Sequence, residues 1–191
     1  MAETPSINVL GFAGSLRKGS FNRMLLRSAV ELAPPGMTID TFELDLIPLY
    51  NGDVEAQGNP EPVAEWKEAI HRADAILVVT PEYNYGVPGV LKNAIDWASR
   101  PPGKSVLNGK PAALMGASTG AFGSVRAQLQ LRQAFVFTQT HAVLVPEVLV
   151  AKAHEKFDAE GRLTDEPTRK FVRQLLEALS VWTERLRRGH S

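Results

Sequence analysis

Short apolar runs alternate along this chain with amphipathic helical patterns, and this alternation constrains the fold more than any other feature. Three runs, at residues 7–11, 75–80 and 111–117, are almost continuously apolar. Strands of this kind are typical of parallel sheets that helices cover on both faces. Residues 37–44 instead alternate apolar with polar residues, as an edge strand does. We therefore expect one α/β domain over residues 1–191, a doubly wound, five-stranded parallel sheet with five helices.

The remaining strand, the helices and one long connection complete this expectation. The last strand should occupy residues 141–150, interrupted or bent at Pro146. Residues 45–62 have no periodicity and contain several prolines and glycines, which predicts a long irregular connection with a functional or interfacial role. Apolar residues recur at helical spacing in residues 25–33, 63–73, 90–98, 125–137 and 171–186.

Charge and composition exclude several classes of function. Lys plus Arg equals Asp plus Glu at 21 each, so no electrostatic argument favours nucleic acid or an anionic membrane as the partner. The absence of cysteine excludes disulfides and Cys-ligated metals, and the four histidines are scattered, which argues against any metal site. With no secretory signal and no apolar run near the ~18 residues that cross a bilayer, we expect a cytoplasmic protein. Any redox chemistry would depend on an organic cofactor.

The loop after the first predicted strand has the composition of an anion site. Residues 14–22 read Gly-Ser-Leu-Arg-Lys-Gly-Ser-Phe-Asn and lead into a helix. A helix N-terminus carries unpaired N–H groups and a partial positive charge, so it can bind a phosphate. Ser15, Ser20 and Asn22 would add donors, and Arg17 a full charge. The alternative is an ordinary strand-to-helix turn in which Ser20 or Asn22 caps the helix.

This loop does not match two familiar nucleotide-binding motifs. Gly14 and Gly19 have the spacing of a P-loop, but Ser20 and Phe21 stand where that motif needs Lys and Ser or Thr. The pattern Gly11-x-x-Gly14 also differs from the dinucleotide motif Gly-x-Gly-x-x-Gly. ATP or GTP hydrolysis is therefore disfavoured, although a P-loop-like nucleotide binder remains an alternative.

Two more loops of unusual composition follow strands expected at the same edge of the sheet. Residues 81–89 begin Pro-Glu-Tyr-Asn-Tyr-Gly, which combines aromatic surface with an amide and could contact a ligand. The alternative is an ordinary turn in which one aromatic side chain, such as Tyr85, folds onto the core. Residues 118–123, Ser-Thr-Gly-Ala-Phe-Gly, could present backbone N–H groups to a ligand or form an ordinary helix entry. Because doubly wound sheets bind ligands beyond the carboxyl ends of their strands, we expect these loops and residues 14–22 to form one site.

The three loops resemble those of the NAD(P)H-dependent FMN reductases, flavodoxin-like enzymes that include quinone, azo-dye and chromate reductases. The resemblance rests on the motifs Gly-Ser-x-Arg-x-x-Ser-x-Asn and Pro-Glu-Tyr-Asn and extends from about Ile7 to the closing helix. It implies strand order 2-1-3-4-5, FMN across the ends of strands one, three and four, and the FMN phosphate on Ser15, Arg17, Ser20 and Asn22. The full set of implied cofactor-binding residues is Ser15, Arg17, Ser20, Phe21, Asn22, Pro81, Glu82, Tyr83, Asn84, Ser118, Thr119, Gly120 and Gly123.

The resemblance also implies a function and an assembly. Hydride would pass from NADPH or NADH to FMN, and then to a quinone-like or other small acceptor or to free FMN, with no catalytic side chain because the flavin carries the chemistry. Family members are usually homodimers or homotetramers, and residues 45–62 and 86–97 are our candidates for the subunit boundary. The main alternative is a non-enzymatic flavodoxin-type electron carrier; such carriers have a strongly acidic surface, whereas this chain is neutral overall.

Overall fold

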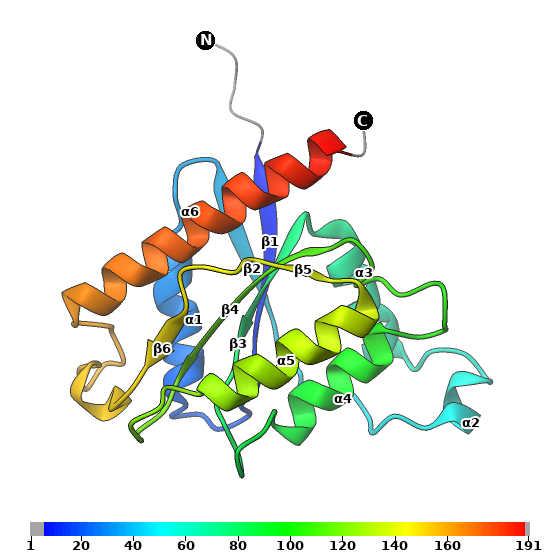
Figure 1. The fold of residues 1–191 in the computed structure, drawn as a ribbon. Coiled ribbons are helices and arrows are strands. Elements are labelled where there is room, and N and C mark those ends of the chain that lie inside the picture. The colour runs from blue at the N-terminus through cyan, green and yellow to red at the C-terminus, as the bar shows by residue number, and fades with distance from the viewer. Residues whose placement is uncertain (1–5, 190–191) are drawn as a thin grey trace.

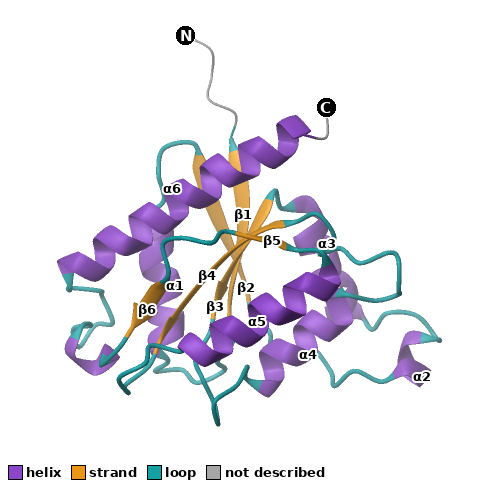
Figure 2. Cartoon of the chain, viewed as in Figure 1, coloured by secondary structure: helices purple, strands orange, loops and turns teal. Residues whose placement is uncertain are grey.

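A parallel sheet with helices on both faces forms the centre of the computed structural model, which describes residues 6–189 (Figures 1 and 2). The sheet has six strands in the order β2-β1-β3-β4-β5, and the sixth strand, β6, also pairs with β4. Every pairing is parallel. The strands are β1 (Ile7–Ala13), β2 (Met37–Phe42), β3 (Ala75–Val79), β4 (Pro111–Ala117), β5 (His141–Ala142) and β6 (Val148–Val150). The flavodoxin-like order expected from the sequence is confirmed.

The sheet contains the five expected positions and one additional strand, because the last expected strand is divided into β5 and β6. β5 pairs with the beginning of β4, at Pro111 and Ala112, whereas β6 pairs with its end, at Met115 to Ala117. Pro146 lies in the segment between them, and proline has no N–H to donate to a sheet ladder. The predicted interruption at Pro146 is therefore confirmed, and it produces two short strands along one edge of β4.

Two layers of helices bury the two faces of the sheet. On one face, α1 (Phe21–Glu31) and the long α6 (Glu166–Gly189) pack against strand residues such as Val9 and Leu77. On the other face, α3 (Glu61–Arg72), α4 (Gly89–Ala98) and α5 (Val125–Thr138) pack against residues such as Phe12. Successive side chains of a strand point to opposite faces, so strands covered on both sides need apolar residues throughout. This explains the continuous apolar runs in the sequence.

The expected irregular connection over residues 45–62 contains one short helix, α2 (Gly52–Glu55), and is fixed against α4. The indole Nε1 of Trp97 and the amide Nδ2 of Asn93 both donate to the carbonyl oxygen of Pro48, each at 2.8 Å. The backbone N–H of Tyr50 donates to Asn93 Oδ1, also at 2.8 Å. The connection therefore lacks long regular structure but has a defined conformation.

Two absences concern the described part of the chain. Within residues 6–189, no helix combines the length and the apolar character needed to span a membrane. The same residues contain no group of three or more His, Cys, Asp or Glu side chains arranged to hold a metal ion. A single turn of 3-10 helix, η1 (Ala153–Glu155), completes the described elements.

Candidate functional site

Three loops meet beyond the carboxyl ends of β1, β3 and β4 and surround one pocket of about 200 Å³. We call residues 14–20, 80–88 and 118–124 the first, second and third loops. The pocket is lined by Ser15, Arg17, Ser20, Phe21, Asn22, Pro81, Glu82, Tyr83, Ala117, Ser118 and Thr119. Asn84, Gly120 and Gly123, which were also predicted, lie in the second and third loops but do not line it. Ala117 lines the pocket and was not predicted, because an alanine at a strand end carries no distinguishing signal.

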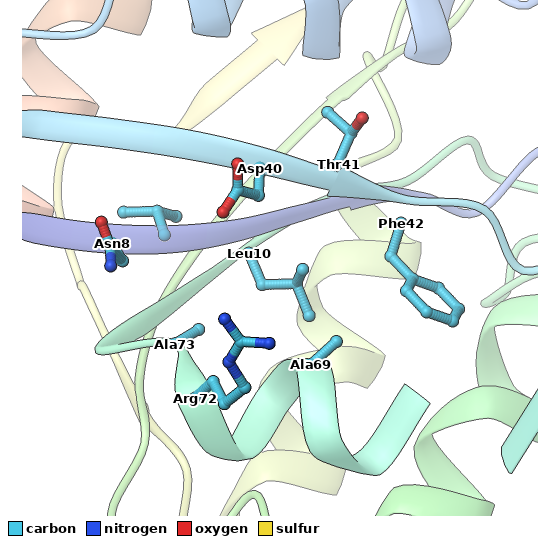
Figure 3. A pocket seen from close by; sticks show the side chains of 9 residues that line it. Asn8, Leu10, Asp40, Thr41, Phe42, Ala69, Arg72 and Ala73 are labelled. Carbon is cyan, nitrogen blue, oxygen red and sulfur yellow. The ribbon is translucent and has the colours of Figure 1, made fainter. Parts of the chain in front are cut away.

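A different hollow lies between β1, β2 and α3. Figure 3 shows Asp40, from β2, and Arg72, from α3, on either side of Leu10 in this hollow of about 240 Å³. It shares no lining residue with the pocket among the three loops. The chemistry-bearing motifs therefore mark the three-loop pocket as the candidate site.

The first loop presents unpaired backbone donors at the start of α1. Ser20 is the N-cap of the helix, and its Oγ accepts from the N–H groups of Asn22 and Arg23 at 3.2 and 3.4 Å. Within the described residues, the N–H groups of residues 15–19 donate to no acceptor. Such donors at a helix N-terminus, where the helix dipole is positive, form a site for an anion.

Arg17 and Gly14 shape this loop in different ways. The Arg17 guanidinium donates from Nη2 to the carbonyl oxygen of Gly19 at 2.8 Å, and no carboxylate of residues 6–189 pairs with it. Its charge is therefore available to a bound anion. Gly14 lies directly against α4, where an added Cβ would be 2.9 Å from Leu91 Cδ2. The glycine thus allows the loop to leave β1 close to the neighbouring helix.

The second loop is a tight turn with an unusual backbone. The N–H of Tyr83 donates to Gly86 O at 3.1 Å, and the N–H of Gly86 donates to Tyr83 O at 2.9 Å. Between them, Asn84 and Tyr85 have φ angles of 50° and 63°, the left-handed pair of a type I′ turn. Asparagine tolerates this region, whereas a tyrosine there is strained, and such strain is concentrated at functional sites.

The two tyrosines of this turn face solvent near the pocket. The Tyr83 hydroxyl lies 3.3 Å from Ser15 Oγ, which links the second loop to the first. Tyr85 is 68% exposed, so the alternative in which this ring folds onto the core is contradicted. Instead, the Tyr85 ring stacks on the guanidinium of Arg126, whose Cζ lies 4.0 Å from the ring centroid. Phe122 of the third loop stacks on the same guanidinium, with 4.6 Å between Cζ and its ring centroid.

Glu82 caps a helix that begins more than forty residues later in the chain. Its carboxylate accepts from the backbone N–H groups of Arg126 at 2.8 Å and Ala127 at 3.4 Å, and pairs with Arg126 Nη1 at 3.0 Å. Ser124, at the N-cap position of α5, makes no side-chain cap bond. Glu82 therefore supplies the missing cap from the second loop and joins that loop to the third.

The third loop is held from outside by the segment that follows β6. The N–H groups of Lys152 and Ala153 donate to Gly120 O at 3.0 Å and Ser118 O at 2.9 Å, and Ser118 N–H donates to Val150 O at 2.9 Å. In contrast, the N–H groups of Thr119 and residues 121–124 have no acceptor among the described residues. The loop thus has a fixed outer side and a row of open donors.

Gly123 has a structural reason to be glycine. Its φ is +53°, and an added Cβ would lie 2.5 Å from the carbonyl carbon of Leu149. The positive φ and the close approach to β6 explain why this residue is glycine, and no contact with a ligand is needed to explain it.

Asn22 has both ends of its amide engaged with β4. Its Oδ1 accepts from Ala117 N–H at 2.8 Å, and its Nδ2 donates to Ala117 O at 2.9 Å. The side chain is only 3% exposed. The sequence predicted a donor to phosphate at this position, and that role stays a prediction; in the structure the side-chain amide has a partner 95 residues away and Asn22 lines the pocket.

Comparison with known proteins agrees with this geometry. Residues 7–155 match the family model described as NADPH-dependent FMN reductase. An NAD(P)H-dependent FMN reductase of Pseudomonas aeruginosa is 53% identical over 95% of this chain and 97% of its own length. An NADPH:quinone oxidoreductase of Arabidopsis thaliana is 44% identical over 95% of this chain and 94% of its own.

A solved structure has the same fold. FerB, an NAD(P)H:(acceptor) oxidoreductase from Paracoccus denitrificans, superposes with a TM-score of 0.85 and 38% identity, over 94% of this chain and 98% of its own. This match extends over nearly the whole of both proteins, and the residues matched by the family model include all three loops. The chain therefore belongs to the NADPH-dependent FMN reductase family.

Proposed function

We propose that this protein holds FMN among its three loops and transfers hydride from NAD(P)H to a quinone or another small acceptor. The observation that carries the proposal is the set of unpaired N–H groups at residues 15–19 beside the unpaired charge of Arg17. These donors fit a phosphate monoester, which needs several hydrogen bonds and a positive charge. FMN carries such a phosphate at one end and a flat ring at the other.

The phosphate end of the proposed site consists of the first loop and Ser20. Ser15 and Ser20 are buried but line the pocket, and Arg17 lies at its rim. Ser20 Oγ accepts from two backbone N–H groups, which leaves its own hydrogen free to donate to a phosphate oxygen. The helix dipole of α1 adds to the attraction for a dianion.

The ring end of the proposed site lies between the second and third loops. Pro81 and Tyr83 offer apolar and aromatic surface there, and Thr119 and Ala121 offer open backbone donors. Bound FMN would supply the acceptor for a hydride and the donor for the next substrate. The chain's own contribution is to fix the ring's position and to place N–H groups near the side of the ring where negative charge increases.

Glu82 is compatible with this role because its charge is already balanced. The carboxylate faces Arg126 and the N-terminus of α5, so it does not oppose negative charge on a nearby ring. We assign no side chain of the site as general acid or base.

The proposed acceptor is a quinone, since relatives at 42% and 44% identity are named quinone reductases or quinone oxidoreductases. A direct test is to load the protein with FMN, add NADPH and then a benzoquinone under anaerobic conditions. The oxidised-flavin absorption should be bleached by NADPH and restored by the quinone. If the protein binds FMN but neither NADPH nor NADH bleaches the flavin absorption, the enzymatic proposal is refuted. The alternative of a non-enzymatic electron carrier would then be favoured.

We further propose that the protein assembles as a homodimer or homotetramer. Leu46 and Leu49, in the fixed connection over residues 45–62, are 71% and 84% exposed, and Val136 and Phe137 of α5 are 75% and 86% exposed. Large apolar side chains on rigid elements are typical of interfaces. Light scattering on a sizing column should give a mass of at least two chains; a monomer at micromolar concentration would refute this part.

A further inference from the structure

We propose that Asn22 is a positioning residue that sets the distance between the phosphate end and the ring end of the site. It would act through the backbone of Ala117 rather than by touching the phosphate. This inference rests on the proposed function, because it concerns the way the chain holds a flavin.

The amide of Asn22 takes the place of a missing strand. In β4, Met115 O accepts from Thr80 N–H on the side of β3, and the next residue that faces this side is Ala117. β3 ends at Val79, where the second loop begins, so no strand pairs with Ala117 on this side; its other side faces Val150 of β6. Asn22 supplies one acceptor and one donor there, at 2.8 and 2.9 Å, in place of the two partners that a neighbouring parallel strand would provide.

This contact joins the two ends of the candidate site. Asn22 follows the N-cap Ser20 by two residues, at the phosphate end. Ala117 immediately precedes Ser118, where the third loop begins at the ring end. Both bonds are buried, so water does not compete for them. The contact between Asn22 and Ala117 therefore fixes the position of the first loop relative to the third loop.

The two roles for Asn22 predict different patterns of ligand affinity. A phosphate ligand matters for FMN and not for riboflavin, which lacks the phosphate. A residue that fixes the spacing of the loops matters for both flavins, because the ring of either one contacts the third loop. A misplacement of about 1 Å can reduce a reaction rate about 100-fold, and we expect a smaller loss of affinity when only the loop that contacts the ring is displaced.

The test compares Asn22→Ala with Ser20→Ala as the matched variant at the phosphate end. Dissociation constants for FMN and riboflavin are measured by quenching of flavin fluorescence on apoprotein. We expect Ser20→Ala to weaken FMN alone, and Asn22→Ala to weaken both flavins by the same factor, on the order of 10-fold. The visible circular dichroism of the bound flavin should also change in Asn22→Ala, since the ring would sit differently.

Each contrary result has a definite meaning. If Asn22→Ala weakens FMN alone, Asn22 is a phosphate ligand and the positioning role is refuted; unchanged affinity for both flavins refutes it as well. Wild-type protein that binds neither flavin refutes the proposed function itself. If Asn22→Ala does not fold, Asn22→Ser takes its place, because its hydroxyl adds no charge beside the phosphate and is too short to make both bonds to Ala117. Amide exchange in the apoprotein provides a second readout: Ala117 N–H should lose protection in the variant, whereas Gly14 N–H, bonded to Val79 O, should keep it. Equal protection of Ala117 in both proteins would overturn the proposal.

Discussion

Replacing Glu82 with glutamine should destabilise the fold, because the Glu82 carboxylate caps α5 from another loop. Glu82→Gln keeps the volume and one acceptor for Arg126 N–H, but it removes the negative charge. That charge pairs with Arg126 Nη1 at 3.0 Å, and the Glu82 side chain is only 11% exposed. A charge at a helix N-terminus contributes about 0.3–1 kcal/mol, and a charge-assisted hydrogen bond contributes about 1.5–3 kcal/mol, of which the neutral amide retains part. We expect the free energy of unfolding to fall by about 1–2 kcal/mol.

Urea unfolding of the apoprotein measures this loss, and thermal unfolding gives a second value. For a chain of this size, about 1 kcal/mol corresponds to roughly 2–4 °C in Tm. Glu43→Gln is the matched control, because Glu43 also pairs with an arginine, Arg23, but is 58% exposed. An exposed pair contributes about 0–1 kcal/mol. If Glu82→Gln costs no more than Glu43→Gln, Glu82 does not cap α5 in solution.

Two further predictions concern a loop glycine and a helix cap. Gly14→Ala should lower the free energy of unfolding by about 1–3 kcal/mol, because its Cβ would lie 2.9 Å from Leu91 Cδ2. Gly19→Ala is the control: its Cβ would have no atom within 4 Å, so it should be nearly neutral in the same urea titration. Equal effects of the two substitutions would contradict the tight approach of this loop to α4. Asp165 accepts from Thr168 at the start of α6, and the Thr168 hydroxyl, followed by Lys156, holds the pKa of Asp165 below its ordinary value of 3.8. The ionised Asp165 carboxylate should therefore stabilise the fold fully above about pH 4, and this stabilisation should be lost as the pH falls through the lowered pKa. The free energies of unfolding of wild type and Asp165→Asn should then converge in acid. A constant difference between them from pH 7 to 2 would contradict the assignment.

Much of the fold could be predicted because local signals and tertiary constraints agree. The apolar runs at residues 7–11, 75–80 and 111–117 became the three central strands, β1, β3 and β4, since only strands buried on both faces need such runs. Pro146 correctly marked an interruption. The sequence did not reveal that β5 and β6 would pair with opposite ends of β4, because segments of two and three residues carry no measurable periodicity.

The candidate site was predicted as a set of loops, but not the contacts inside it. The loop motifs located the pocket, and the structure brings Ser15, Arg17 and Ser20 together at one end of it. The roles of Glu82 and Asn22 depend on partners 44 and 95 residues away, at Arg126 and Ala117. No pattern of residue spacing indicates such pairs, since each depends on where a different strand ends. The contacts of all the predicted residues with FMN stay predictions.

The affinity ratio of FMN to riboflavin tests the central claim most directly. The claim is that the first loop binds the phosphate of FMN, with Arg17 and Ser20 as donors. Apoprotein is titrated with each flavin, for wild type and for the double variant Arg17→Ala/Ser20→Ala. The account predicts that wild type binds FMN much more tightly than riboflavin, and that the double variant loses most of this preference while its riboflavin affinity stays the same. Equal losses for the two flavins, or no binding of FMN at micromolar concentration, would contradict it.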